Sequence, residues 1–169
     1  MNYKRLIVKI VLLTLLLLLS YGFAKSVFAL DDWSLKYVES VYWLENPDDY
    51  KTHECKYPLR KIAKAFAIVE SNNCSRWLSL RSKNCWSLHK WWTYNRWDGV
   101  SYMRNTEPLR IYTRQTAAAY DFMYLWVKWY WCKVDYNHIK FYICGRADWC
   151  RGSSYTYLRN LKKIILNTN

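Results

Sequence analysis

The hydrophobic pattern begins with an uninterrupted apolar stretch near the amino terminus. "MNYKRLIVK" is basic, and "IVLLTLLLLLSYGFA" follows it without a charged residue. Val27 and Ala29 stand where a signal peptidase accepts small residues, so residues 1–29 are predicted to be a secretory signal peptide. The alternative is a single membrane anchor over residues 6–24, because the run is near the lower length limit for a span. Both alternatives send the rest of the chain out of the cytoplasm.

Helical spacing appears again after the leader. Asp31 or Asp32 can cap a helix, and "PDDYKTHE" is expected to interrupt it. Residues 30–57 are therefore predicted to be an N-terminal helix and a linker, which either packs on the main domain or serves as a spacer. The apolar positions that keep helical spacing here are Leu35, Val38, Val41, Tyr42 and Leu44.

A stronger helix signal starts at Pro58, which suits a first helical turn. The row Ile62, Phe66 and Glu70 recurs at every fourth residue, so Glu70 is expected on the buried face. It also stands at the carboxyl end of the helix. Desolvation and the negative end of the helix dipole would both favour its protonated form. Acid catalysis at a glycosidic oxygen needs a carboxyl group in that form.

The rest of the chain also favours helices over strands. Residues 72–113 are irregular and polar, and "TRQTAAAYDFMYLWVKWYWCKV" (113–134) predicts the longest helix, opened by Thr113 and apolar on nearly all sides. A last helix is expected over 154–166, capped by Ser153 or Ser154. The fold class is therefore mainly α with irregular loops, and residues 58–169 form the main domain. The expected core stripes are Ala118, Phe122, Leu125, Trp126 and Trp129, and Leu158, Leu161, Ile164 and Ile165.

All six cysteines fall in the exported part, which predicts three disulfides in an oxidising compartment. Short loops close most easily, so Cys74 is expected to pair with Cys85, and Cys144 with Cys150. Cys55 then pairs with Cys132 by elimination. The cysteines and histidines have no metal-ligand spacing, so neither a metal site nor a cofactor is predicted.

Charge and aromatic content narrow the class of partner. Removal of residues 1–29 takes four of the 26 basic residues and no acid, which leaves 22 basic against 13 acidic residues, a net charge of +9. Outside the cytoplasm such a surface favours cell-wall polyanions or a membrane surface, although solubility alone explains it equally well. No nucleic-acid motif is present. The dense aromatic segment "NCWSLHKWWTYNRW" is expected to place some rings in a groove, since rings stack on sugars.

Four blocks, in this order, resemble the lysozyme-like superfamily, specifically small exported domains of the lytic transglycosylase and glucosaminidase type. They are "LRKIAKAFAIVESNNCS", "SLRSKNCWSLHKW", "PLRIYTRQTAAAYDFMYLW" and "WCRGSSYTYLRNL". The catalytic glutamate of the family ends a helix in an A-x-x-E-S pattern, which falls on Glu70 and Ser71. An N-C-[WF]-G-[ILM] block that lines the sugar site corresponds to Asn84–Leu88, with Ser87 where the family prefers glycine. The third block opens the long helix at Tyr112.

The resemblance implies cleavage of the β-1,4 bond between N-acetylmuramic acid and N-acetylglucosamine in peptidoglycan, with Glu70 as general acid. A two-carboxylate scheme needs a second acid, for which Asp98 is preferred over Glu107, Asp121 and Asp148. A lytic transglycosylase needs only one acid, because the 6-hydroxyl and N-acetyl groups of the substrate replace water and nucleophile. The implied substrate-binding residues are Ser71, Trp86, Ser87, Leu88, Trp91, Trp92, Tyr112 and Tyr120, with core packing as the alternative for the aromatic ones.

Two other functions fit the same residues. One is a non-catalytic cell-wall or glycan-binding domain on the same fold, which Ser87 and the missing second acid favour. The other is a basic, disulfide-rich protein that acts on membranes or as an inhibitor. The position of Glu70 distinguishes them, because a glutamate on a convex surface away from any groove would remove the motive for both glycan hypotheses.

Overall fold

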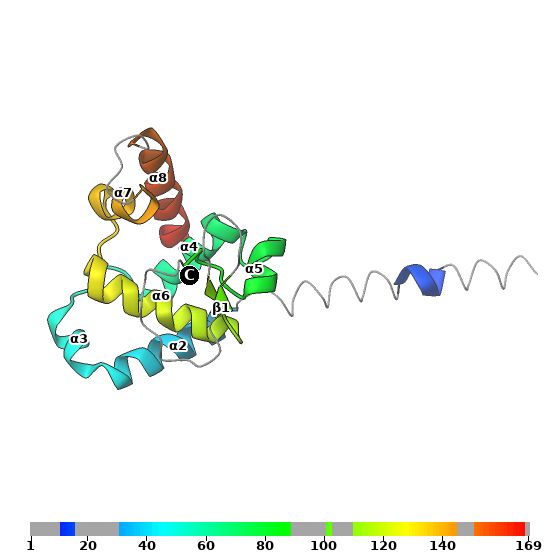
Figure 1. The fold of residues 1–169 in the computed structure, drawn as a ribbon, viewed down its shortest axis with the longest axis horizontal. Coiled ribbons are helices and arrows are strands. Elements are labelled where there is room, and N and C mark those ends of the chain that lie inside the picture. Colours follow the sequence, from blue (N-terminus) through cyan, green and yellow to red (C-terminus); the bar gives the residue numbers. More distant parts are fainter. Residues whose placement is uncertain (1–10, 16–30, 89–100, 103–109, 145–150, 168–169) are drawn as a thin grey trace, which may run out of the picture.

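The computed structural model describes residues 11–15, 31–88, 101–102, 110–144 and 151–167, and this part of the chain is mainly helical (Figure 1). Residues 11–15 form one helical turn, and the remainder of the predicted leader lies outside the described residues. No described helix is long and apolar enough to cross a bilayer. The helices that carry the fold are α2 (Asp32–Glu45), α3 (Pro47–Thr52), α4 (Leu59–Ser71), α5 (Trp77–Ser82), α6 (Gln115–Tyr130), α7 (Tyr136–Cys144) and α8 (Arg151–Asn167).

Helix α2 is part of the main core and not a spacer. Asp31 caps it by accepting a hydrogen bond from the Ser34 amide at 2.7 Å, as its position predicts. Leu35, Val38 and Tyr42 are buried against α4 and α6. The predicted division at residue 57 therefore does not separate two packing units. Leu44 lies in the same helix, as its spacing predicts, but it is 82% exposed and is not part of the core.

The segment "PDDYKTHE" interrupts the helix before it, as predicted, and most of it forms the short helix α3, which was not predicted. Helix α2 does end at Glu45, but Pro47 then begins a second short helix. Proline is well suited to this position, because the first helical amide needs no intrahelical acceptor. The chain thus turns a corner at Asn46, and α3 leads from the end of α2 toward the start of α4 (Figure 1).

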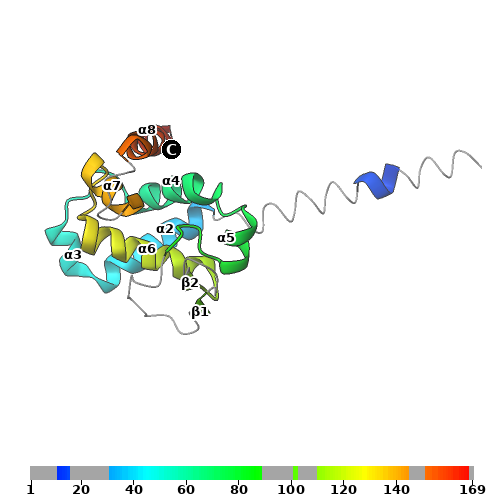
Figure 2. The same cartoon turned by 45° about the horizontal axis from the view of Figure 1, so that its top comes forward.

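The centre of the molecule is formed by α4 and α6. Figure 2 shows α4 between α8 on one side and α2 with α6 on the other, and these helices pack directly on one another. Phe66 of α4 is fully buried and contacts the rings of Phe122 and Trp126 at centroid distances of 5.1 and 4.6 Å. The apolar stripe of the predicted 58–70 helix is thus confirmed as core.

Helix α6 is buried on most of its circumference, as its continuous apolar pattern predicts. Two details of the prediction for this helix, its first residue and the burial of Trp129, were wrong. Arg114 and not Thr113 precedes its first turn, without a side-chain cap. Trp129, which the stripe placed in the core, is 70% exposed near the helix end. A residue at the edge of a helical stripe becomes buried only if a neighbouring element covers it.

The remaining elements are short or were not predicted. Strands β1 (Ser101–Tyr102) and β2 (Arg110–Ile111) form an antiparallel ladder that pairs Ser101 with Ile111. Helices α5 and α7 had no separate prediction. Helix α8 starts at Arg151, before the expected caps, and Ser154 is buried within it. Its predicted inward residues Leu158, Leu161 and Ile165 are buried, and Ile164 is partly buried.

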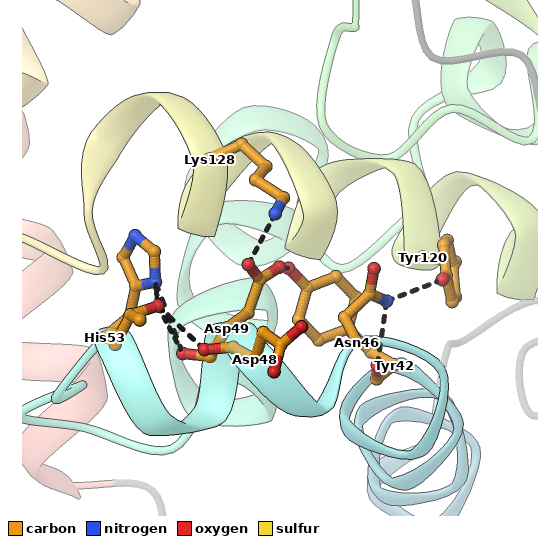
Figure 3. A network of polar contacts seen from close by, with 8 residues as sticks. Tyr42, Asn46, Asp48, Asp49, His53, Tyr120 and Lys128 are labelled. Carbon is orange, nitrogen blue, oxygen red and sulfur yellow. Dashed lines mark hydrogen bonds and ion pairs between the residues drawn. The ribbon is translucent and has the colours of Figure 1, made fainter.

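A buried polar network fixes α2, α3 and α6 to one another (Figure 3). The Asp49 carboxylate accepts a hydrogen bond from the Tyr42 hydroxyl at 2.7 Å and an ion-pair contact from Lys128. Asn46 donates to the Tyr42 carbonyl at 2.9 Å and to the Tyr120 hydroxyl at 3.1 Å. Burial would raise the pKa of Asp49, but the Lys128 and Tyr42 donors hold that pKa below its ordinary value.

Two of the three predicted disulfides are confirmed. Cys55 is bonded to Cys132, with a Cα–Cα distance of 5.0 Å, and Cys74 is bonded to Cys85, with a distance of 4.9 Å. The predicted pair of Cys144 with Cys150 falls outside the described residues, since Cys150 is not among them. Disulfides of this kind persist in an extracellular or otherwise oxidising compartment.

Candidate functional site

The site is built around the end of α4, where the chain changes conformation abruptly. Asn72, Asn73 and Cys74 all have positive φ, at 51°, 56° and 67°. Asparagine tolerates the left-handed region better than most residues, so the sequence Asn-Asn ends the helix directly after Ser71. The Ser71 hydroxyl donates to the Ala67 carbonyl at 2.7 Å and accepts from the Cys74 amide at 2.9 Å.

These bonds correct the expected role of Ser71. Its side chain is buried and both of its bonds go to the main chain of the turn. Ser71 therefore shapes the end of α4 and does not contact a substrate from this position. The Glu70–Ser71 pair does end the helix, as the sequence pattern predicts. The role of Ser71 in that pattern is structural.

Glu70 is half-buried in the last turn of α4. Its side-chain oxygen Oε1 accepts a hydrogen bond from the hydroxyl of Tyr157 on α8. Its main-chain carbonyl accepts from Arg76 Nη1 at 3.0 Å. In the described part of the chain, Tyr157 is the one donor to the Glu70 carboxylate, and its bond is to Oε1.

Two tyrosines from different helices stand beside Glu70. The rings of Tyr142 on α7 and Tyr157 on α8 contact Phe66, one turn before Glu70, at centroid distances of 4.9 and 5.9 Å. Burial raises the pKa of each phenol far above its ordinary value, and the nearby Glu70 charge raises it further. Both phenols therefore remain protonated, and Tyr157 acts as a hydrogen-bond donor and not as a base.

The segment Asn84–Leu88 is a closed turn that Asn84 organises. The buried Asn84 amide nitrogen donates to the Leu88 carbonyl at 2.9 Å and to the Arg110 carbonyl at 3.0 Å, while its oxygen accepts from the Leu88 amide at 2.9 Å. These three bonds fix the turn to strand β2. Asn84 was not predicted as a site residue, although the N-C-W-S-L block contains it.

Trp86 and Leu88 are core residues, which corrects their expected contact with sugar. Trp86 is completely buried, donates its indole N–H to the Ala63 carbonyl at 2.8 Å and stacks on Phe122. Leu88 is likewise buried. A ring enclosed in this way has no free face for a saccharide. Of the two roles open for Trp86, core packing and sugar stacking, the structure supports core packing.

The turn is nevertheless placed next to Glu70. The Cys74–Cys85 disulfide ties the end of α4 to it, and the Tyr142 hydroxyl donates to the Trp86 carbonyl at 2.6 Å. Ser87 is half-buried at a φ of 52°, in the left-handed region that favours glycine. The position at which the resemblance expects glycine therefore does require a glycine-like backbone, and Ser87 adopts it.

Tyr112 and Tyr120 are buried and take part in structural hydrogen-bond networks. This agrees with core packing, the alternative to substrate binding that was open for these aromatic residues. Tyr112 and Arg110 both donate to Asp121 Oδ2 at 2.9 Å. Burial raises the pKa of Asp121 to about 6, against the effect of these two donors. Tyr120 donates to Glu45 at 2.7 Å. Asp121 thus joins α6 to strand β2 and its neighbour Tyr112, and does not belong to the Glu70 site.

The other candidates fall outside the described residues. These are Asp98, Trp91 and Trp92, together with the less favoured acids Glu107 and Asp148. Glu70 lines neither the cleft between α2 and the start of α4 nor the hollow along α8. In the same part of the chain, no group of three histidine, cysteine, aspartate or glutamate residues could hold a metal ion.

The arrangement brings together groups that are far apart in the sequence. Glu70, Tyr142 and Tyr157 come from three helices, and the 84–88 turn is fixed beside them. Sequence reasoning identified Glu70 but missed both tyrosines, because a tyrosine at helical spacing looks like any other core residue. The only available signal was the Tyr157–Leu158 pair in the last block of the resemblance. Chemically, the site is the Glu70 carboxyl group, whose oxygen Oε1 accepts a hydrogen bond from the Tyr157 hydroxyl.

Comparison with known proteins gives no relative of this chain: no family model, no curated protein and no solved structure matches it. We therefore infer function from the chemistry of the Glu70 site.

Proposed function

We propose that this protein is an exported peptidoglycan glycosidase with a lysozyme-like domain, in which Glu70 is the general acid. The observation that carries the proposal is the half-buried Glu70 carboxyl group at the end of α4, with Oε1 fixed by the Tyr157 hydroxyl. A general acid must present its proton in a constant direction, and this hydrogen bond fixes the carboxyl group.

The proposed reaction is of the lytic transglycosylase type. Glu70 donates its proton to the glycosidic oxygen as the bond to the anomeric carbon breaks. The 6-hydroxyl of the same muramyl residue then attacks that carbon, and its proton returns to Glu70. The products are a 1,6-anhydromuramyl end and a free N-acetylglucosamine end. This route is favoured because it needs one acid, and Asp121, the candidate second acid in the described part, is engaged by Arg110 and Tyr112.

The order of the elements also supports the proposal. The helix that ends at Glu70 is followed by the N-C-W-S-L turn and then by a long buried helix that opens after Tyr112. The disulfide Cys74–Cys85 joins the first two of these segments. The resemblance implies this succession, and a secreted or surface-held location, by signal peptide or by anchor, follows from the same proposal.

The direct test is Glu70→Gln, which keeps the shape of the side chain and removes its acid. We expect the rate of muropeptide release from purified peptidoglycan to fall by about 100-fold or more, since general acids contribute on that order. The far-ultraviolet circular dichroism should not change, because Glu70 is only half-buried. Equal release by the variant would refute the enzyme proposal, and mass spectrometry of anhydromuramyl ends identifies the reaction type.

A second candidate is a glycan-binding domain without catalysis, which the lack of a second free acid favours, because Asp121, the candidate in the described part of the chain, is engaged by Arg110 and Tyr112. Retention of the protein on insoluble peptidoglycan, with no soluble muropeptides released at any time, would establish this candidate over the first.

A further inference from the structure

An open cleft of about 730 Å³ lies beside α2, at the end of α4 opposite to Glu70. One face of α2 forms one wall, and the chain from α3 to the start of α4 forms the other. Arg60, at the cleft, and Glu70 are ten residues apart on α4, which is about 15 Å along a helix. The cleft is therefore separate from the Glu70 site, and its volume is within the range of small-ligand sites.

The wall contributed by α2 is a regular helical face. Lys36, Glu39, Ser40 and Trp43 line the cleft at spacings of three and four residues, next to the face that Leu35, Val38 and Tyr42 bury. The residues of this wall are polar except for Trp43. The helix thus has two adjacent faces with different environments, one against the core and one against the cleft.

Aromatic rings supply the apolar part of the cleft. The Trp43 ring makes edge contacts with Tyr42 at 5.0 Å and with Tyr50 at 5.4 Å between centroids. Contacts on two sides fix the orientation of the Trp43 ring before any ligand arrives. Tyr50 is 69% exposed, and Tyr57 also lines the cleft. Rigid aromatic rings at an open surface provide contact area at a small cost in conformational entropy.

The charges of the cleft nearly cancel. Glu39 is buried, and its carboxylate accepts from the Arg60 amide at 3.3 Å and from Arg60 Nη1 at 2.5 Å. Lys36 and Lys51 add two positive charges, and Glu54 adds one negative charge. A polyanion would meet two carboxylates here. In contrast, α8 carries Arg159, Lys162 and Lys163 on its exposed surface and has no acidic residue in its sequence.

We propose that this cleft is a non-catalytic binding site for a neutral oligosaccharide. Sugar rings present an apolar face that stacks on rings such as Trp43 and Tyr50. Their hydroxyl groups can accept from Lys36 and Lys51 and donate to the exposed Glu54. The mixture of fixed aromatic rings and balanced charge matches this ligand chemistry. It does not match an anionic polymer, for which α8 offers the better surface. The site does not depend on the chemistry of Glu70.

The test is calorimetric titration of the full chain with the tetrasaccharide of N-acetylglucosamine. We expect Trp43→Ala and Tyr50→Ala each to weaken binding by about fivefold to tenfold, the effect of one lost aromatic contact. Trp33→Ala is the matched control, because Trp33 also lies on α2, is 74% exposed and does not line the cleft. Tyr50 is mostly exposed, so its variant remains informative if Trp43→Ala is unstable.

Glu70→Gln separates this site from the proposed active site. We expect it to bind the tetrasaccharide as the wild type does, whether or not the enzyme proposal holds. The cleft proposal is overturned if Tyr50→Ala binds with unchanged affinity, or if Trp33→Ala weakens binding as much as Tyr50→Ala. It is also overturned if the full chain binds an anionic polysaccharide but not the tetrasaccharide.

Discussion

At the residue scale, the hydrogen bond from Tyr157 to Glu70 is the contact that most directly links structure to the proposed chemistry. Tyr157 belongs to α8 and reaches the end of α4, so the two groups are 87 residues apart in the chain. Burial raises the pKa of Tyr157 well above its ordinary value, which keeps the phenol a donor at all physiological pH values. The bond therefore orients the Glu70 carboxyl group, and the protonated phenol does not act as a base toward it.

We expect Tyr157→Phe to reduce the rate of glycan cleavage by about tenfold, while Glu70→Gln reduces it much further. A hydrogen bond to a charged group is worth about 1.5–3 kcal/mol, and about tenfold in rate corresponds to the lower end of that range. Tyr157→Phe keeps the ring against Phe66, so the free energy of unfolding should fall only by about the 1.5–3 kcal/mol of the lost hydrogen bond. The measurements are initial rates over a range of pH and urea unfolding. A rate equal to that of the wild type would mean that Tyr157 only packs.

At the element scale, α2 and α3 are held on α6 by one buried carboxylate, Asp49 (Figure 3). Tyr42 and Lys128 come from the two neighbouring helices, and both donate to it. The pKa of Asp49 in the folded protein is below its ordinary value of 3.8. Its stabilising contribution is therefore complete above that value and is lost as the pH falls through the lower, folded-state pKa.

We expect the free energy of unfolding of the wild type to fall as the pH is lowered from about 4 to about 2, and Asp49→Asn to show a smaller fall. At neutral pH the variant should be less stable by about 1–3 kcal/mol, because a charged hydrogen-bond acceptor has been removed. Asp48→Asn is the matched control, since Asp48 is exposed on the same helix. Urea titrations at each pH give both quantities. Parallel curves for wild type and Asp49→Asn would contradict the role of Asp49.

At the scale of the whole molecule, two disulfides tie distant parts of the helical core. Cys55–Cys132 joins the segment before α4 to the segment after α6, over 77 residues. Cys74–Cys85 closes only 11 residues, but these connect the end of α4 to the 84–88 turn. One bond therefore restrains the whole chain, and the other restrains the proposed site.

We expect the double serine variant of Cys55 and Cys132 to lose about 4–5 kcal/mol of unfolding free energy, and that of Cys74 and Cys85 about 3 kcal/mol, from the loop lengths they close. Guanidinium unfolding measures both. The rate of glycan cleavage should show the opposite order, with the larger loss in the Cys74 and Cys85 variant, because the turn beside Glu70 is then free to move. If the Cys55 and Cys132 variant showed the larger loss in both unfolding free energy and cleavage rate, the Cys74–Cys85 bond would have no special role at the proposed site.

The sequence by itself determined the class of fold, the Cys74–Cys85 pair and the position of Glu70, because these follow from local spacing. The Cys55–Cys132 pair followed only by elimination. Ile62 and Phe66 repeat at helical intervals, and such a repeat predicts a buried face wherever the helix packs. Tertiary structure alone decided that Leu44 and Trp129 are exposed, and that Trp86 is core and not a sugar platform. Burial at the edge of a stripe depends on which element covers it. The meeting of Glu70, Tyr142 and Tyr157, and the cleft beside α2, also required the packed helices, since no local pattern records which distant residues come into contact.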